Sequence, residues 1–280
     1  MHDQHKTLSH ATRIVSALLV GGALATEAGA AAWTRAEGTS LFSVPLVYST
    51  ADESFNEDGD RVDRLKFEIL EVVPTYEYGV TDELTFGLQP RYLSVEEETA
   101  EGDTVSNEGL AETEVYLRKN LWRKDDAAFS TQFGLKVPID PQEDHRVPLG
   151  RDQVDAEVSL MYGNRHRGEN ATFFYNVDVG YRKRFEEPDD QASLGGFAGV
   201  SVSKWTFLAT ADSTVGLDSP RFSSDEVLTA GRSFTRHKAG VALSYRVGDS
   251  FSVGANASRT RAGESVGAAD YVGVSAFALW

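Results

Sequence analysis

Several features are missing from this chain of 280 residues. It contains no cysteine, which excludes a disulfide framework and cysteine-based metal sites. Beyond its N-terminal part it has no run of about 18 apolar residues, which excludes helices that span a membrane. Basic residues are few, 27 against 43 acidic ones, and the net charge of −16 argues against nucleic-acid binding, which requires a basic surface.

Catalytic signatures are also absent from the sequence. There is no G-x-S-x-G elbow for a nucleophilic serine, and no pair of histidines at the spacing of a zinc-binding helix. His145 and His166 fall in polar connections, and His237 lies between Arg236 and Lys238, which suits a charged rim better than a general base. The sequence therefore predicts no enzyme, no metal site and no cofactor.

The N-terminal part of the chain differs from the rest. A positively charged stretch precedes a short apolar run at 14–25, and small residues follow it. The small-residue cleavage rule is satisfied after Ala30 and again after Ala32. We therefore expect residues 1–30 to be a secretory signal peptide, with an N-terminal anchor helix as the alternative, and residues 31–280 to form one domain.

The chain ends on the alternating stretch YVGVSAFALW. Side chains of a strand switch faces with a period of two, so one face carries Val272, Val274, Ala276, Ala278 and Trp280. The last strand of a transmembrane β-barrel must pair with the first, because an open backbone edge is not tolerated in lipid. This ending resembles the C-terminal signal of bacterial outer-membrane barrels, which implies recognition by the barrel-assembly machinery.

Strand-like stretches recur at regular spacing along the rest of the chain. The expected strands are 41–49, 64–78, 84–93, 110–122, 127–137, 153–163, 171–185, 191–203, 205–211, 233–247, 251–260 and 271–280. With two exceptions the connections alternate between long and short, as in barrels with long extracellular loops and short periplasmic turns. The sequence predicts an all-β, antiparallel up-and-down transmembrane barrel of about twelve strands in the bacterial outer membrane, in contact with lipid and lipopolysaccharide.

The second expected strand contains a break in its alternation. Phe67 and Ile69 share one face, whereas Val72 and the tyrosines that follow it share the other. A β-bulge at residues 70–71 would place both sets on the outside of the barrel. Without the bulge, Glu71 would face lipid, where a charge is costly.

Charged side chains of expected strands three to seven fall on the face opposite the apolar one. They are Arg91, Glu112, Glu114, Arg118, Lys136, Asp155, Glu157, Asp178, Arg182 and Arg184. A central Arg or Lys on the lipid side would cost about 2–4 kcal/mol, so the shared face predicts a wet or internally paired lumen. Eight-stranded barrels are filled by side chains and those of sixteen or more strands leave an open channel, so a barrel of twelve strands is intermediate. The sequence is therefore compatible with a narrow charge-lined pore and with a salt-bridged interior.

Two of the expected connections, 52–63 and 96–108, are strongly acidic. They would attract cations or bridge to lipopolysaccharide phosphates through Ca²⁺ or Mg²⁺, but solvated loops are the favoured interpretation. The acidic run at 56–60 loosely suggests a calcium loop, although it lacks the twelve-residue spacing that ends in Glu.

Short stretches at 78–84, 109–122, 134–138, 180–185 and the chain end resemble a family of Gram-negative outer-membrane transporters, related to the meta-pathway of phenol degradation barrel family. The resemblance implies the barrel fold and the outer-membrane location, and it transfers no catalytic residue. The leading prediction is a passive channel for a small, unidentified solute. The alternatives are a non-conducting structural or surface-interaction barrel and a barrel-borne hydrolase. The hydrolase requires a Ser or Asp within hydrogen-bond reach of a His near the outer rim.

Overall fold

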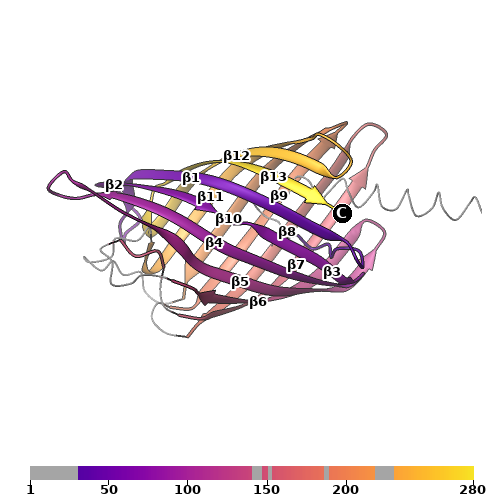
Figure 1. Cartoon of the computed structure of the whole chain (residues 1–280), viewed down its shortest axis with the longest axis horizontal. Coiled ribbons are helices and arrows are strands. Elements are labelled where there is room, and N and C mark those ends of the chain that lie inside the picture. The colour runs from indigo at the N-terminus through magenta and orange to yellow at the C-terminus, as the bar shows by residue number, and fades with distance from the viewer. Residues whose placement is uncertain (1–30, 141–146, 151–152, 186–188, 218–229) are drawn as a thin grey trace, which may run out of the picture.

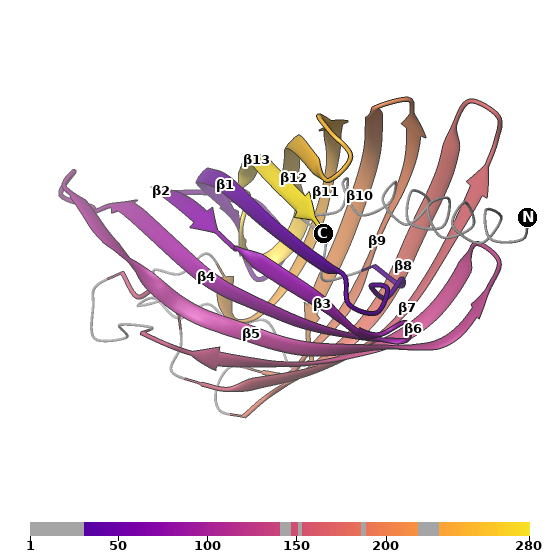
Figure 2. The same cartoon turned by 45° about the vertical axis from the view of Figure 1, so that its right-hand side comes forward.

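The computed structural model describes residues 31–140, 147–150, 153–185, 189–217 and 230–280, and the predicted signal peptide lies outside these ranges. The described chain forms one antiparallel sheet rolled into a barrel (Figures 1 and 2). No described helix is long and apolar enough to cross a membrane. The predicted all-β antiparallel fold is confirmed.

The strands follow one another around the barrel in chain order. They are β1 (Ser40–Phe55), β2 (Arg61–Val72), β3 (Thr75–Thr81), β4 (Leu84–Glu98), β5 (Thr104–Lys124), β6 (Ala127–Pro138), β7 (Asp155–Arg167), β8 (Thr172–Arg184), β9 (Gln191–Val202), β10 (Trp205–Gly216), β11 (Ala230–Arg246), β12 (Phe251–Gly267) and β13 (Asp270–Leu279).

The barrel closes between its last and first strands. β13 pairs with β1 in continuous register from Leu41↔Leu279 to Thr50↔Asp270. β2 and β3 both lie between β1 and β4, and they are separated where Pro74, which has no N–H, interrupts the ladder. Together these two strands occupy one strand position of the barrel wall, and we call each such position a stave. The barrel therefore has 12 staves, the number of strands that the sequence predicts.

The outer wall follows the predicted alternation. On β8 the predicted outward residues are 42–56% exposed, namely Phe173, Tyr175, Val177, Val179 and Tyr181. Their neighbour Asn176, which points the other way, is 1% exposed. Exposed apolar side chains on a closed barrel form the band that faces lipid. The chain-terminal Trp280 belongs to the same exposed set.

The strands are longer than predicted, and three expected loops were placed wrongly. Residues 52–63, 96–108 and 261–267 lie mostly in strands, so the connections that remain are 56–60, 99–103 and 268–269. About 9–11 residues span a membrane, whereas β5 contains 21 and β12 contains 17. Beyond the membrane both faces of a ladder meet water, so the apolar alternation stops before the hydrogen bonds do.

The predicted position of the β-bulge in β2, at residues 70–71, is also wrong, because the β1–β2 register shifts between Asp63 and Phe67 instead. β2 pairs with β4 without a register shift from Phe67↔Glu97 to Val72↔Tyr92. Phe67 is buried and packs with other inward apolar side chains, and Ile69 packs against the same cluster. Glu71 shares this inner face and forms a salt bridge with Arg91. The face change that the bulge would explain therefore does not occur.

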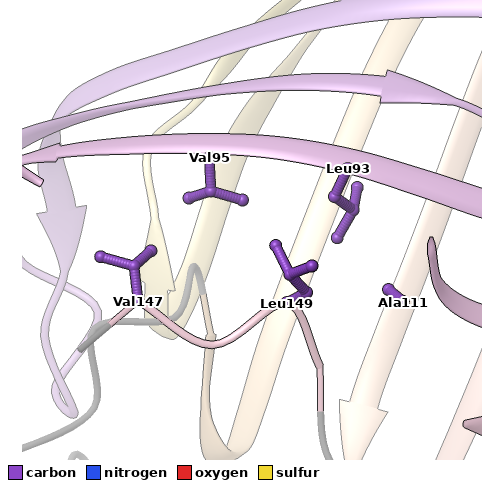
Figure 3. Close-up of a cluster of buried hydrophobic side chains, with 5 residues drawn as sticks. All are labelled: Leu93, Val95, Ala111, Val147 and Leu149. Carbon is purple, nitrogen blue, oxygen red and sulfur yellow. The ribbon is translucent and has the colours of Figure 1, made fainter. Parts of the chain in front are cut away.

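The inner face is apolar around Ile69 because a loop segment, residues 147–149, packs against it. Val147 and Leu149 pack against Leu93 and Val95 of β4 and against an alanine of β5 (Figure 3). The Asn107 side chain holds the segment by donating a hydrogen bond of 2.9 Å to the Val147 carbonyl. Residues 147–149 thus lie on the inner side of the sheet, at the end of the barrel opposite the short turns.

Candidate functional site

Acidic and basic side chains alternate along the inner wall from stave to stave. We call this set the charge belt: Glu71, Arg91, Glu112, Lys136, Asp155 and Arg184. Arg91 lies between two carboxylates, with Nε 2.5 Å from Glu71 Oε1 and Nη1 3.2 Å from Glu112 Oε1. Lys136 Nζ approaches Glu112 Oε2 at 3.1 Å. The β4–β5 register places Arg91 directly opposite Glu112, whereas Lys136 is opposite Glu114 and reaches Glu112 along the diagonal of the β5–β6 ladder.

The charge belt continues onto β7 and β8. Asp155 is 2% exposed, and its two carboxylate oxygens lie 3.6 Å from Lys136 Nζ and 3.6 Å from Arg184 Nε. The Gln153 side chain donates a further hydrogen bond of 2.8 Å to Asp155. The belt therefore carries three acidic and three basic groups, which balance one another along half of the wall.

A second pair lies next to the belt, closer to the short turns. Arg182 Nη2 is 2.6 Å from Glu157 Oε2, and the Ser159 hydroxyl donates to the other Glu157 oxygen at 3.0 Å. Glu114 and Asp178 are on the same inner face, and neither forms a salt bridge with another residue that the structure describes. Glu114 is opposite Lys136 in the β5–β6 register, so the excess of negative charge at this level is small.

Arg118 lies deeper in the wall than the belt residues. We call its surroundings the Glu77 cluster: Glu77, Arg35, Tyr116 and Arg118. Glu77 and Arg118 are fully buried. Glu77 accepts from Arg118 at 2.9 Å, from the Tyr116 hydroxyl at 2.7 Å and from Arg35 at 2.5 Å. Arg118 also donates to Gln132 at 3.1 Å. Glu77, Tyr116 and Arg118 are almost completely shielded from solvent, while the Arg35 side chain, which precedes β1, is 11% exposed.

The opposite wall presents positive charge. Asp212 of β10 lies 3.3 Å from Lys238 and 3.7 Å from Arg236, both on β11. A cavity of about 390 Å³ separates this wall from the charge belt, because its lining includes Glu71 and Arg91 together with Arg236 and Lys238. The interior is thus not completely filled by paired side chains.

All ten predicted lumen residues are placed by these contacts. Five belong to the charge belt, Arg182 and Glu157 form the adjacent pair, and Arg118 belongs to the Glu77 cluster. Glu114 and Asp178 lie beside them. Their role as the lining of a conducting lumen stays a prediction.

Sequence reasoning missed Glu71, Glu77, Asp212 and the basic pair on β11. The signal for Glu77 was present, because it alternates with the outward Tyr76 and Tyr78. Glu71 was not counted among the inward charges, because Phe67 and Ile69, which share its face, were assumed to face lipid. Apolar residues on an inner face break the simple rule that apolar means outward.

One described pair satisfies the condition set for a hydrolase, which was a Ser or Asp within hydrogen-bond reach of a His. Ser213 Oγ lies 2.9 Å from His237 Nδ1, across the β10–β11 ladder. Both side chains point outward, and no described carboxylate hydrogen-bonds to His237. No described group of three His, Cys, Asp or Glu residues could hold a metal ion. In the acidic turn, Asn56 Oδ1 instead accepts the backbone N–H groups of Asp58 and Asp60.

Comparison with known proteins identifies the fold. No protein-family model and no curated protein matches the chain, so the resemblance to the meta-pathway of phenol degradation family is not confirmed. The solved COG4313 outer membrane channel from Pseudomonas putida F1 has a TM-score of 0.67 at 14% identity, covering 89% of this chain and 98% of that one. The NanC porin has a TM-score of 0.52 at 8% identity, covering 84% and 98%.

These similarities show the fold alone, since the sequence identities are low. The closed 12-stave barrel, its exposed apolar wall and its short turns agree with that fold. The chain is an outer-membrane β-barrel with the architecture of Gram-negative channels and porins.

Proposed function

We propose that the barrel is a passive channel for a small solute, with the charge belt as its constriction. The observation that carries this proposal is the pairing of belt charges along one wall while a cavity of about 390 Å³ separates them from the opposite wall. Paired charges that belong to one side of a barrel leave room for water on the other. The proteins of similar fold are named as a channel and a porin, which supports the same function.

The belt suits a solute that carries both polar groups and charge. Its acidic and basic groups lie within 3.6 Å of one another, so a passing solute would meet donors and acceptors at one level. Charged side chains that line a pore set its ion preference. The solute belongs to the class of small polar molecules. The sequence resemblance also supports membership of the phenol-degradation transporter family as part of the proposal. We further propose contact with lipopolysaccharide and recognition of β13 by the barrel-assembly machinery.

A non-conducting barrel is the main alternative. The inward segment with Val147 and Leu149 reduces the space at the outer end, and residues before β1 lie inside the other end. If neither segment moves, the interior would serve only to hold the wall. Conductance distinguishes the two functions directly.

A barrel-borne hydrolase is the second candidate, because Ser213 and His237 are within hydrogen-bond distance. Acyl transfer also requires donors that stabilise an oxyanion. Backbone N–H groups next to this pair are engaged in the strand ladder. A serine-reactive fluorophosphonate probe tests the candidate, and labelling that is lost in Ser213→Ala would establish it.

The channel is tested by the ion selectivity of the purified protein in planar lipid bilayers. Replacing Arg91 and Lys136 together by glutamine removes two positive charges from a balanced belt. We expect the double variant to conduct and to shift its reversal potential in a salt gradient toward cation preference, because the belt then carries net negative charge.

The control is Lys119→Gln, which removes a positive charge from a side chain that is 48% exposed in the pair with Glu83. We expect no change of selectivity in this variant. A wild-type barrel that is folded and does not conduct would contradict the channel. Conduction with unchanged selectivity in the double variant would contradict the belt as constriction.

A further inference from the structure

The outer wall of the barrel carries two adjoining hollows. The larger, of about 700 Å³, is lined by outward residues of β8 to β11, and the smaller, of about 510 Å³, is lined by outward residues of β11 and β12. Ala239 and Arg261 line both hollows, so the two form one depression, which we call the outer groove. The outer groove lies on the wall whose exposed apolar side chains face lipid.

Small side chains form the floor of the outer groove. The outward floor residues are Gly196, Ala198, Ala209, Ala211, Ala239 and Ala257. The ladders bring them side by side, since Ala211 is opposite Gly196 on β9 and opposite Ala239 on β11. Larger side chains border this floor, such as Leu194, which is 54% exposed, and Val241, which is 62% exposed. The groove therefore results from a step in side-chain size on the apolar wall.

The outer groove extends toward the end of the barrel opposite the short turns. Trp205 and Tyr245 lie beside the short turns, with ring centroids 4.6 Å apart, as expected for an aromatic girdle at one interface. Along β11 the interval from Tyr245 to His237 approaches the about 9–11 residues that cross a membrane. His237 therefore lies at the other interface. In barrels of this kind the long connections are extracellular, so this interface belongs to the outer leaflet.

Polar side chains gather at this outer end of the groove. Ser213 Oγ and His237 Nδ1 are 2.9 Å apart, and Arg259 pairs with Asp270 of the neighbouring strand. Arg261 is exposed and forms no salt bridge with any residue that the structure describes. Two arginines against one aspartate leave an excess of positive charge, in a chain whose net charge is −16.

A β-bulge positions the unpaired arginine. The β11–β12 register shifts between His237↔Ala262 and Lys238↔Thr260, so Arg261 is the extra residue without a partner on β11. Thr260 is fully buried on the inner face, whereas Arg261 lines both hollows of the outer groove. Bulges are over-represented next to functional sites, because they direct a side chain that a regular ladder would place elsewhere.

We propose that the outer groove binds one lipopolysaccharide molecule of the outer leaflet, with an acyl chain of lipid A in the hollows and a lipid A phosphate on Arg261 and Arg259. This site gives residues to the contact with lipopolysaccharide proposed above, and it does not depend on conduction. Guanidinium groups bind phosphate through parallel hydrogen bonds, and basic residues at a membrane surface attract anionic headgroups. A second copy of the chain fits less well, because a symmetric contact would bring like charges together.

The site is tested by native mass spectrometry of the purified full-length barrel, titrated with lipid A in the presence of EDTA. We expect one lipid A per barrel, and binding about fivefold weaker in Arg261→Gln, since a basic residue contributes this much near an anionic surface. Lys183→Gln is the matched control, because Lys183 lies at the same end of β8, outside the groove, and is 50% exposed. Equal binding by the two variants would overturn the site.

The headgroup contact is tested with lipid A from which the phosphates have been removed. We expect the wild type to prefer the phosphorylated lipid and Arg261→Gln to discriminate less between the two lipids. An unchanged ratio of affinities in Arg261→Gln would show that this side chain does not meet the phosphate.

The acyl-chain contact is tested by Ala211→Leu, which fills the floor of the groove. We expect severalfold weaker binding of lipid A, because the chain loses its space. Ala156→Leu is the matched control, since Ala156 lies opposite the exposed Leu135 on the outer wall, away from the groove. Equal binding by these two variants would overturn the placement of the chain.

Two further outcomes separate this site from lipopolysaccharide contact in general. If lipid A binds only without EDTA, the contact runs through divalent cations and the acidic connections, which overturns this site and leaves the general contact standing. The chain has no cysteine, so Ala239→Cys introduces a single thiol into the groove. Disulfide-linked dimers of this variant in outer membranes would show that a second copy covers the groove, and would also overturn the lipid site.

Discussion

Replacing Glu77 by alanine is expected to destabilise the barrel by about 3–5 kcal/mol, because it leaves a buried charge without its partner. Glu77 is the carboxylate that both Arg118 and Arg35 contact, and Arg118 has no exposed side-chain surface. The Tyr116 hydroxyl loses its acceptor in the same variant. Urea unfolding in lipid vesicles, followed by the mobility difference between heated and unheated samples, measures the change in free energy of unfolding.

The matched control is Glu83→Ala. Glu83 pairs with Lys119 at 2.6 Å, but the two side chains are 67% and 48% exposed. Exposed pairs contribute about 0–1 kcal/mol, so we expect little change. Equal effects of Glu77→Ala and Glu83→Ala would show that water reaches the Glu77 cluster.

A double variant separates lost charge pairing from lost volume in this cluster. Glu77→Gln combined with Arg118→Met removes both members of the buried pair and keeps most of their volume. We expect it to be more stable than Glu77→Gln alone, since the fully buried Arg118 charge is then removed and only the partly exposed Arg35 lacks the carboxylate. Additive losses in the double variant would contradict this coupling.

Replacing Val177 by arginine is expected to cost about 2–4 kcal/mol, the penalty for a basic side chain at the centre of the lipid-facing wall. Val177 lies in the middle of β8 and is 46% exposed on the outer face. The penalty should appear as a lower urea midpoint and as a smaller heat-modifiable fraction in outer membranes.

Val177→Leu serves as the control for this position, because it keeps an apolar surface of similar size. We expect it to behave like the wild type. If arginine is tolerated as well as leucine, the exposed apolar face does not contact lipid, and the assignment of inside and outside would be reversed or the barrel would not span the membrane.

The outward face and the number of staves could be predicted because they depend on local geometry. A strand alternates its side chains with a period of two, and lipid requires the apolar set of every strand to lie on the same side. The outward face of β8 can therefore be recognised from the sequence. The closing strand can also be recognised, since a barrel in lipid has no free edge.

Strand ends could not be predicted from the same pattern. Hydrogen bonds between β4 and β5 continue to Glu98↔Thr104, where neither face meets lipid. Apolar alternation marks the part of a strand that crosses the membrane, whereas the hydrogen-bonded ladder ends where two neighbouring strands separate. These two boundaries differ by several residues on the long strands.

The partners of the inner charges also required the tertiary structure. The sequence places Arg118 and Arg182 on the same face, yet one is locked between Glu77 and the Trp33 carbonyl and the other pairs with Glu157. The register between staves decides such contacts, and the sequence does not specify it. Curvature decides the rest, because it brings Ala31 against residues more than 140 positions away along the chain, such as Phe174.

The sequence by itself thus determined the class of fold, most of the lipid-facing surface and part of the set of inward charges, since each follows from period-two alternation in a membrane. Only the tertiary structure decided how the interior is filled. The inward Phe67, the folded-in Val147 and the residues that precede β1 occupy space that exists only after the sheet has closed. No local pattern encodes a space enclosed by strands that are distant in sequence.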